Sequence, residues 1–401
     1  MFRDYSEFFN DPGKQHNIMV LVGNGFDVAA VKRYGEGQLK GTLPKYSAFY
    51  DYVTSHAGPE VLKYNRIYKE MTKDREEGHN ENWSDFELIV DRLITEINSN
   101  KRRRDTELGI LKRNLEVIRD WFSRFLRELI PTETMIAINN DSMKKELALQ
   151  SFSKFLGDLD IPDLVDLRFE RSTSYFDIFS FLLVNFNYTM LLDNYLFLDS
   201  EQFDPVKFKS PNVDRNFTFY PAPTIEPRTL PGEHNCDISW SSYLVTEMVH
   251  PHGFMDIPRS IIFGTELDKY EKHGKETEKL FVKSYWARDE IKYSKYFEGA
   301  ELFIIYGMSI TKTDAWWFDH IYERLLDDEP EMIIYAHYSG DVAGRTRQGF
   351  KEEIKDRFIR SCIRNGKDNS KNEKVKEKIK VVVMEDNDTY FLGFEKKTGT
   401  T

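Results

Sequence analysis

The sequence predicts a doubly wound α/β fold, in which a mainly parallel, Rossmann-like sheet carries one helical insertion. Short apolar runs recur at wide intervals along the 401 residues, and helical patterns lie between several of them. The runs are nearly continuous rather than alternating, which is typical of strands buried on both faces. Strand, helix and strand in repetition indicate a parallel sheet with helices on both sides. A long stretch without any strand signal predicts the insertion.

The expected strands are the apolar runs, and the first of them, 18–22, ends in a Gly-Asn-Gly turn. Helices are expected over 316–326 and 349–364, where apolar residues recur at helical spacing. The Pro-, Asn- and Ser-rich segment 205–247 is expected to be a long ordered loop, and the charged segment 365–378 a surface loop. The six expected strands cover 18–22, 179–188, 260–263, 302–306, 332–338 and 379–384.

The stretch without strand signal is expected to be helical. Ser84 and Glu87 form a capping box, in which a hydroxyl and a carboxylate bond to free amides at a helix start. Two amphipathic patterns follow, and Pro131 lies just beyond the second. Packing alone explains such periodicity, so we expect the helical segment to be a lid or an assembly surface without a catalytic group. Glu87 is the exception, because a carboxylate in the first turn could face the crevice. The expected divisions are 1–82 and 176–401 for the α/β domain and 83–175 for the helical insertion.

Composition and charge exclude several classes of protein. The chain has 56 basic and 67 acidic residues, hence a formal charge of −11, which argues against a broad basic face for nucleic acid or an anionic membrane. Two cysteines are too few for a disulfide framework or for a four-cysteine zinc site. No clean apolar run reaches about 18 residues, so we expect no membrane-spanning helix and a cytoplasmic protein.

The first candidate site is the Gly-Asn-Gly-Phe-Asp run at 23–27, where the first strand ends. Glycines let a backbone turn sharply and approach a phosphate, while the next helix offers free amides and the positive end of its dipole. Val28 occupies the third glycine position of the dinucleotide fingerprint, so the match is partial. The alternative is a tight strand-to-helix turn with no ligand. Asp27 would repel a phosphate, so we expect it to cap the helix or to hold a hydroxyl group.

The second candidate lies at the end of the second strand. In an extended chain Asn185, Asn187 and Thr189 share one face. Two amides on one face of an apolar strand need partners, because an unpaired buried amide costs about 1–3 kcal/mol. They either bond to neighbouring loop backbone or hold a ligand.

The third candidate is the His-Pro-His-Gly run at 250–253. In an extended segment both imidazoles point the same way, as in metal sites, but no third ligand follows at a recognised spacing. A structural role and general acid or base chemistry remain open. We expect His250 to be a packing residue and His252 to be the functional one, because Gly253 leaves room for a ligand beside its ring.

The fourth candidate is the Tyr-Gly-Met-Ser turn at 306–309, which Asp314 follows at the start of a helix. Like the other three, it lies at the carboxyl end of an expected strand, where doubly wound sheets bind ligands. We therefore expect the four segments 23–27, 185–189, 250–253 and 306–314 to converge on one crevice.

These motifs also resemble a known series. Together they are similar, in order and over about residues 17–325, to the motifs of the AbiH family of bacteriophage abortive infection proteins. More remotely, the chain resembles the sirtuin-like NAD-binding fold. The motifs that carry the resemblance are Gly-Asn-Gly-Phe-Asp at 23–27, Tyr-Ser-Ala-Phe at 46–49, Trp-Ser-Asp-Phe-Glu at 83–87, Phe-Asn-Tyr-Thr at 186–189, His-Pro-His-Gly at 250–253, Ile-Phe-Gly at 262–264 and Tyr-Gly-Met-Ser at 306–309.

The sirtuin-like resemblance implies roles for three positions. The first glycine turn would hold a diphosphate, Asn187 would reach the nicotinamide ribose, and His252 would act as the base. The chain departs from that pattern at Asp27 and Thr189, and the zinc-binding cysteine quartet is missing, which disfavours protein deacylation. Asn187 and His252 are thus the expected catalytic residues, and no metal is expected. The expected ligand-binding residues are Gly23, Asn24, Gly25, Phe26, Asp27, Thr189, Gly307, Ser309 and Asp314.

The expected function is that of a phage-defence effector that binds NAD or a related nucleotide and cleaves its nicotinamide N-glycosidic bond, with NAD as substrate. The alternative is a non-catalytic nucleotide-binding sensor or interaction protein of a defence system. A nuclease is disfavoured, because neither an acidic metal cluster nor a basic groove is evident. Besides a dinucleotide, the expected partners are a second copy of the chain or a phage-derived activator.

Overall fold

The computed structural model confirms the doubly wound α/β architecture. It describes most of the chain, and every structural statement below concerns the described residues. These are residues 2–5, 13–78, 83–99, 103–145, 147–169, 177–196, 243–264, 279–338, 346–363, 368–385 and 390–395.

The centre of the molecule is a six-stranded sheet in the order β3-β2-β1-β4-β5-β6, and all its neighbouring strands are parallel. The chain runs outward from β1 to one edge, returns to β4 beside β1, and then runs to the other edge. The carboxyl ends of β1 and β4 therefore flank the topological switch point, where sheets of this kind bind ligands. The strands are β1 (Gln15–Val22), β2 (Ile178–Asn185), β3 (Tyr243–Val249), β4 (Leu302–Tyr306), β5 (Glu331–His337) and β6 (Ile379–Met384).

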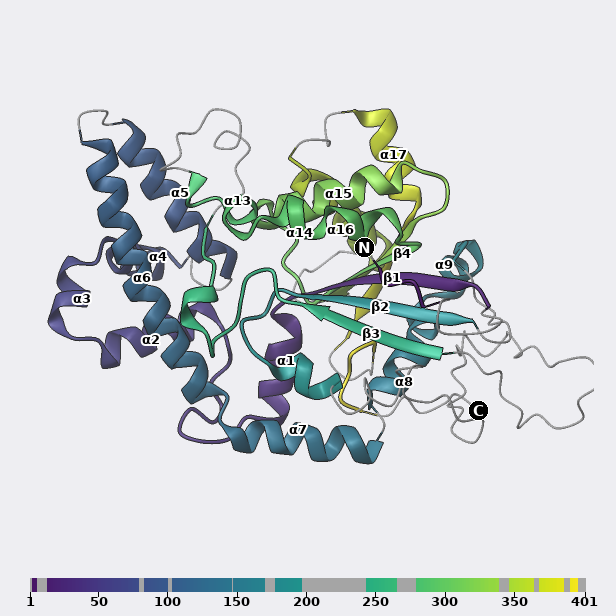
Figure 1. Ribbon diagram of the computed structural model, residues 1–401, viewed down its shortest axis with the longest axis horizontal. Helices are drawn as coiled ribbons and strands as arrows, with labels where there is room; N and C mark the ends of the chain where they lie inside the picture. Colours follow the sequence, from purple (N-terminus) through teal and green to yellow (C-terminus); the bar gives the residue numbers. More distant parts are fainter. Residues whose placement is uncertain are drawn as a thin grey trace, which may run out of the picture.

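Helices cover both faces of the sheet, so its strands are buried on both sides (Figure 1). Ile18 and Val20 of β1 pack toward the face of α1 (Gly25–Tyr34), whereas Met19 and Leu21 pack toward the opposite face. This explains the nearly continuous apolar runs of the strands. Other helices of the two layers are α7 (Thr132–Lys145), α8 (Leu147–Lys154), α9 (Ile161–Asp166), α13 (Lys283–Ala287), α14 (Asp289–Glu298), α15 (Ala315–Leu325), α16 (Arg347–Ser361) and α17 (Asn369–Glu377).

A helical bundle stands beside the carboxyl ends of the strands (Figure 1). It includes the expected helices α5 and α6, but it begins at residue 46, well before the expected start of the insertion at 83. Aromatic side chains hold its members together, with Phe49 of α2 packed against Trp83 of α5 and Phe122 of α6. The bundle helices are α2 (Tyr46–His56), α3 (Pro59–Tyr64), α4 (Arg66–Glu77), α5 (Trp83–Ser99) and α6 (Arg104–Leu129).

The third strand of the sheet lies elsewhere than the sequence predicts. The expected strand at 260–263 is wrong: a 3-10 turn, Pro258–Ser260, ends there, and Ile262 donates its amide to the carbonyl of His252. The strand is Tyr243–Val249, whose first residues fall within the expected loop at 205–247; residues 205–242 lie outside the described residues. β3 is an edge strand in which Thr246 and Glu247 interrupt the apolar residues, and the rule of continuous apolar runs misses it.

The expected surface loop at 365–378 is also wrong over most of its length, because Asn369–Glu377 forms α17. Asp368 caps this helix by accepting from the amides of Ser370 and Lys371. Val375 is fully buried, and Asn372 accepts a hydrogen bond from Tyr322 at 2.8 Å. These two inward-facing residues are enough to dock the helix against the rest of the protein. So few buried positions within a charged segment do not give a recognisable helical pattern.

Across the described ranges, no helix combines the length and apolar character that a bilayer crossing requires.

Candidate functional site

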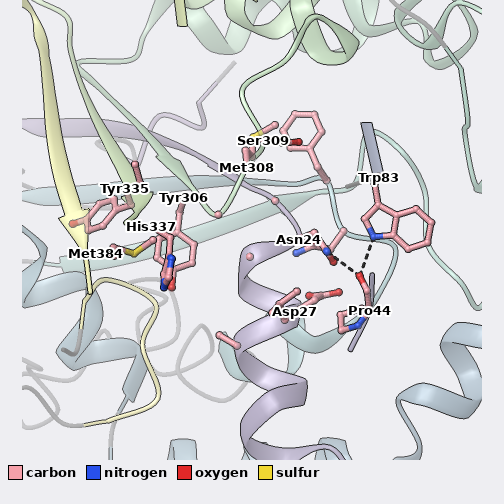
Figure 2. A pocket seen from close by; sticks show the side chains of 18 of the residues that line it. Asn24, Asp27, Pro44, Trp83, Tyr306, Met308, Ser309, Tyr335, His337 and Met384 are labelled. Atoms are coloured by element: carbon pink, nitrogen blue, oxygen red, sulfur yellow. Dashed lines mark hydrogen bonds between the residues drawn. The ribbon is translucent and has the colours of Figure 1, made fainter. Parts of the chain in front are cut away.

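A cavity of about 1300 Å³ opens at the carboxyl ends of β1, β2, β4 and β5. The helical bundle supplies one wall through Trp83, Glu87 and Phe122, so the cavity lies between the sheet and the bundle. Figure 2 shows its two ends: Asn24, Pro44 and Trp83 gather at one, and Tyr306, Tyr335, His337 and Met384, from the carboxyl ends of β4, β5 and β6, gather at the other. All four candidate segments contribute to the lining, at the edge of the sheet where the sequence predicts them.

The two glycine turns of the cavity pack against each other. The amide of Gly23 donates to the carbonyl of Tyr306 at 2.9 Å, and the amide of Gly25 donates to that of Gly307 at 2.8 Å. A Cβ on Gly25 would lie 2.6 Å from the Cα of Gly307, and Gly307 has a φ of +62°. These glycines are therefore needed for the close approach of two turns, and the amides of Gly23 and Gly25 are already engaged within the protein.

Asn24 ties the first turn to the helical bundle. Its Nδ2 donates to the carbonyl of Pro44 at 2.9 Å, and the indole Nε1 of Trp83 donates to the same carbonyl, also at 2.9 Å (Figure 2). One carbonyl thus joins α1, the segment before α2, and α5. Asn24 has a structural bond at the cavity wall.

Asp27 is a buried carboxyl with one unused oxygen. Its Oδ2 accepts from the hydroxyl of Thr189 at 2.7 Å, while its Oδ1 is buried without a partner. Burial raises the pKa of Asp27 to about 7, against the lowering effect of the Thr189 bond. His250 lies nearby and contacts Asp193 at 2.9 Å, so it has a structural partner. The side chain of Asp27 caps no helix amide, and a hydroxyl group is what it holds.

The side-chain amides of Asn185 and Asn187, at the end of β2, leave room for both expected roles, a bond to neighbouring backbone and a bond to a ligand. The Oδ1 of Asn185 accepts from the backbone amide of Asn187 at 3.0 Å, which is a local structural bond. The Nδ2 donors of both side chains are buried without a partner. Asn187 is 4% exposed and lines the cavity, so its Nδ2 is a donor available to a ligand.

The strongest electrostatic feature of the site is Lys283, which the sequence analysis missed. Its side chain is 2% exposed, and its Nζ donates to Oε1 of Glu87 at 2.9 Å and to Oδ1 of Asp314 at 2.6 Å. Nε2 of His252 lies 3.5 Å from the same Asp314 oxygen. The three partners come from the bundle, from the turn after β3 and from the turn after β4, and all line the cavity.

Burial and the charge of Lys283 shift the pKa values of these groups in different directions. Loss of solvent raises the pKa of Glu87 to about 7, because the neighbouring Lys283 compensates only in part. Burial also acts to raise the pKa of Asp314, but the attraction of Lys283 outweighs it, and the pKa falls below its usual value. Burial, reinforced by the charge of Lys283, lowers the pKa of His252 to about 3. At neutral pH His252 is therefore a neutral acceptor, Asp314 is ionised, and Glu87 can exchange a proton.

The space beside His252 is not made by Gly253, which corrects the reasoning from the sequence. Gly253 has a φ of +79°, and a Cβ there would lie 2.1 Å from the carbonyl oxygen of Ser260. This glycine allows the loop after β3 to fold back on itself. Instead, aromatic rings border His252: its ring stacks on that of Tyr188 at 6.2 Å and meets Phe186 edge-on at 5.0 Å.

Most residues expected to form the site line the cavity, and Phe26 does not. Phe26 is fully buried and packs against Tyr195 and Phe394 in the core. Glu87, the exception expected within the helical segment, faces the cavity. Lys283 lies in a five-residue helix among apolar and polar neighbours, and no spacing marks it as functional. The expected residues that line the cavity are Gly23, Asn24, Gly25, Asp27, Asn187, Thr189, His252, Gly307, Ser309 and Asp314.

Groups of three or more His, Cys, Asp or Glu side chains with the arrangement of a metal site do not occur among the residues that the structure describes. The described cysteine, Cys362, is buried and free of any disulfide.

Comparison with known proteins identifies the family. The family described as Bacteriophage abortive infection AbiH matches residues 19–335, which span most of the chain and all four candidate segments. The protein therefore belongs to the AbiH family, which indicates a role in abortive infection by bacteriophage, as the motif series predicts. No curated protein matches the chain.

Proposed function

We propose that this AbiH-family protein is an abortive-infection effector that binds NAD in the cavity and hydrolyses its nicotinamide N-glycosidic bond. The single observation that carries the proposal is the position of the cavity and its polar wall. The cavity lies at the switch point of a parallel sheet in the order that suits dinucleotides. On its wall stand a proton-exchanging carboxyl, an ionised carboxylate and an unpaired amide donor.

These groups match the needs of N-glycoside cleavage. The bond between C1′ of the ribose and the pyridinium nitrogen breaks, and its electron pair leaves with nicotinamide, which becomes neutral. The ribose passes through a state with oxocarbenium character, which a nearby carboxylate stabilises. Asp314, held ionised beside Lys283, is the residue that we assign to this task.

Water completes the reaction by adding to C1′, and a base must take its proton. His252 has a pKa of about 3, so it is a weak base at neutral pH, and we assign it the role of a hydrogen-bond acceptor. Glu87, whose pKa of about 7 matches the task, is the better base. This assignment moves general-base chemistry from His252, where the sirtuin-like resemblance puts it, to the bundle. Asn187 orients a ribose hydroxyl or the water through its free Nδ2.

The diphosphate needs donors other than the amides of Gly23 and Gly25, which donate to Tyr306 at the end of β4 and to Gly307 in the turn after it. Lys32 and Lys45 line the cavity with exposed side chains near α1. Their charges would attract a diphosphate there, while Asp27 would accept from a neutral hydroxyl group rather than face a phosphate.

The direct test is incubation of purified protein with NAD, alone and with an extract of phage-infected cells, while released nicotinamide is measured by chromatography. Release that depends on Glu87 and Asn187, measured in Glu87→Gln and Asn187→Ala variants of unchanged melting temperature, supports the proposal. If NAD binds and stays intact under every condition, cleavage is excluded.

A nucleotide-binding sensor without turnover is the second candidate, and one observation favours it. Lys283 bonds both carboxylates at once, so each carboxylate already has a hydrogen-bond partner without substrate. Binding would then act by pulling Glu87 away from Lys283 and moving the bundle relative to the sheet. In that case NAD would change the protease sensitivity of the bundle without any release of nicotinamide.

A further inference from the structure

We propose that the end of the cavity beneath the helical bundle is a subsite for a flat cation, so that the protein selects the oxidised, pyridinium form of a nicotinamide nucleotide over its neutral reduced form. This inference deepens the proposed function, on which it rests for the identity of the nucleotide. It stands on two features of the wall, its charge and its aromatic lining.

The charge of the wall is unbalanced. Glu87 and Asp314 carry two negative charges when both are ionised, and Lys283 carries the one positive charge that bonds to both. His252 stays neutral beside them, since burial keeps its pKa at about 3. One negative charge is left over in a place that water hardly reaches, where electrostatic attraction is strong. A cation that enters this end of the cavity therefore gains a partner, and an anion is repelled.

Aromatic rings form the rest of this wall. Trp83 meets Phe122 at a centroid distance of 4.9 Å, and Phe122 meets Tyr188 at 5.1 Å. Tyr188 in turn stacks on His252. The rings come from α5, α6 and the turn after β2, and they all line the cavity. Aromatic rings beside an excess carboxylate are the combination that binds organic cations, because the ring faces are electron-rich.

The cavity carries charges of both signs, as a nicotinamide dinucleotide does. Lys32 of α1 lines it, and the excess negative charge lies at Glu87 of α5. Oxidised NAD carries an anionic diphosphate and a cationic pyridinium ring, and reduced NAD has lost the cation. The two forms have the same size, so charge is the property by which this wall can separate them.

The preference for a cation should grow with pH. The charged and titratable groups that face Glu87 are Lys283, Asp314 and Tyr188. His252 lies 3.5 Å from Asp314, and Asp289 of α14 is close to Lys283. Burial raises the pKa of Tyr188 well above its usual value, so it stays neutral, and burial raises the pKa of Asp289 to about 7. Glu87 and Asp289 therefore both gain negative charge between about pH 6 and pH 8. Binding of a cation would favour ionised Glu87 and release protons in this range.

The experiment compares two small probes with purified full-length protein, the cation 1-methylnicotinamide and the neutral nicotinamide, by calorimetry at about pH 8. We expect the cation to bind about tenfold more tightly, which corresponds to the energy of one buried cation–π contact. Oxidised NAD should bind more tightly than reduced NAD by a similar factor. Calorimetry in buffers of different ionisation enthalpy should show proton release at about pH 7.

A matched pair of variants locates the effect. Glu87→Gln keeps an acceptor for Lys283 but removes the excess charge, and it should reduce the preference to below about threefold. Glu385→Gln makes the same chemical change at an exposed position on the other end of the cavity and should leave the preference intact.

Equal binding of the two probes, or a preference unchanged in Glu87→Gln, overturns the inference. If Glu87→Gln fails to fold, a wild-type preference that does not rise from about pH 6 to pH 8 overturns it instead. These outcomes are separate from the proposed function: a clear preference for 1-methylnicotinamide without release of nicotinamide from NAD would support the cation subsite and refute the glycohydrolase.

Discussion

Replacement of Lys283 by methionine tests the cluster at the centre of the site. Methionine fills much of the same space but removes the ammonium that bonds Glu87 and Asp314 at 2.9 and 2.6 Å. The lysine side chain is 2% exposed and its partners are 10% and 13% exposed, so water cannot replace the lost bonds. Loss of one partner from a buried ion pair costs about 3–5 kcal/mol, because the remaining charge is left unpaired. We expect the free energy of unfolding to fall by about this amount at pH 8.

The loss should be smaller in acid. The pKa of Glu87 in the folded protein, about 7, lies above its ordinary value, so the folded state binds this proton more tightly than the unfolded chain does. Its contribution to stability is full below the ordinary pKa and declines as the pH rises through about 7. Without Lys283 the folded pKa of Glu87 rises further, and the decline deepens. The variant should therefore be closer to wild type at about pH 5 than at pH 8.

Urea unfolding followed by circular dichroism at the two pH values measures both effects. The double variant Lys283→Met with Glu87→Gln is the control, because it removes one of the stranded charges and should recover part of the lost stability. A loss below about 1 kcal/mol at pH 8 would be that of an exposed ion pair, and it would refute the idea that this cluster is buried and tightly coupled. A loss of equal size at both pH values would also refute this idea.

Three further predictions concern other parts of the chain. His252→Ala should reduce nicotinamide release, because it removes a hydrogen-bond acceptor from the cavity wall, whereas His250→Ala, which loses its contact with Asp193, should lower stability by about 0.5–3 kcal/mol and retain activity; the reverse pattern contradicts the site. Gly25→Ala should destabilise strongly, because its Cβ would lie 2.6 Å from the Cα of Gly307, while Gly109→Ala, which meets nothing within 4 Å, should be neutral or stabilising in thermal unfolding. The bonds of buried His16 to Asp177 and Glu301 outweigh its desolvation and raise its pKa, so its contribution to stability is full below about 6.5 and is lost as the pH rises through the folded value. His16→Gln should flatten this slope in melting temperatures measured from about pH 6 to pH 9, and an unchanged slope would assign the dependence to another group.

The sequence by itself determined which segments meet at the site. In a parallel sheet all carboxyl ends lie at one edge, so a polar or glycine-rich cluster after each buried run is bound to face the same crevice. This reasoning predicted a shared crevice for 23–27, 185–189, 250–253 and 306–314, and residues of all four segments line the cavity, although Phe26 packs into the core. For three of the segments it rests on strands buried on both faces, which leave continuous apolar runs. The strand before 250–253 was not predicted, so that segment was placed by its motif alone.

Where burial was incomplete, local pattern was not enough. The edge strand Tyr243–Val249 is paired on one side and has Thr246 and Glu247 in the middle of its apolar residues, and α17 buries little more than Val375 and Asn372. Both elements exist because of the neighbours that they dock against. A short stretch of sequence does not show which neighbours it will pack against.

Only the tertiary structure decided what the site can do. Lys283 and Glu87 are 196 residues apart in the chain, and no periodicity links them. Burial under the bundle raises the pKa of Glu87 to about 7 against the opposing effect of Lys283, and burial together with the charge of Lys283 lowers the pKa of His252 to about 3, so base strength moves from the histidine to the carboxyl. The same holds for Gly25, whose amide faces Gly307 across the sheet rather than a phosphate. Residue types specify which charged and hydrogen-bonding groups exist. Whether each group is protonated, and whether it has a hydrogen-bond partner, depends on burial and on distances between remote segments, which only the folded chain sets.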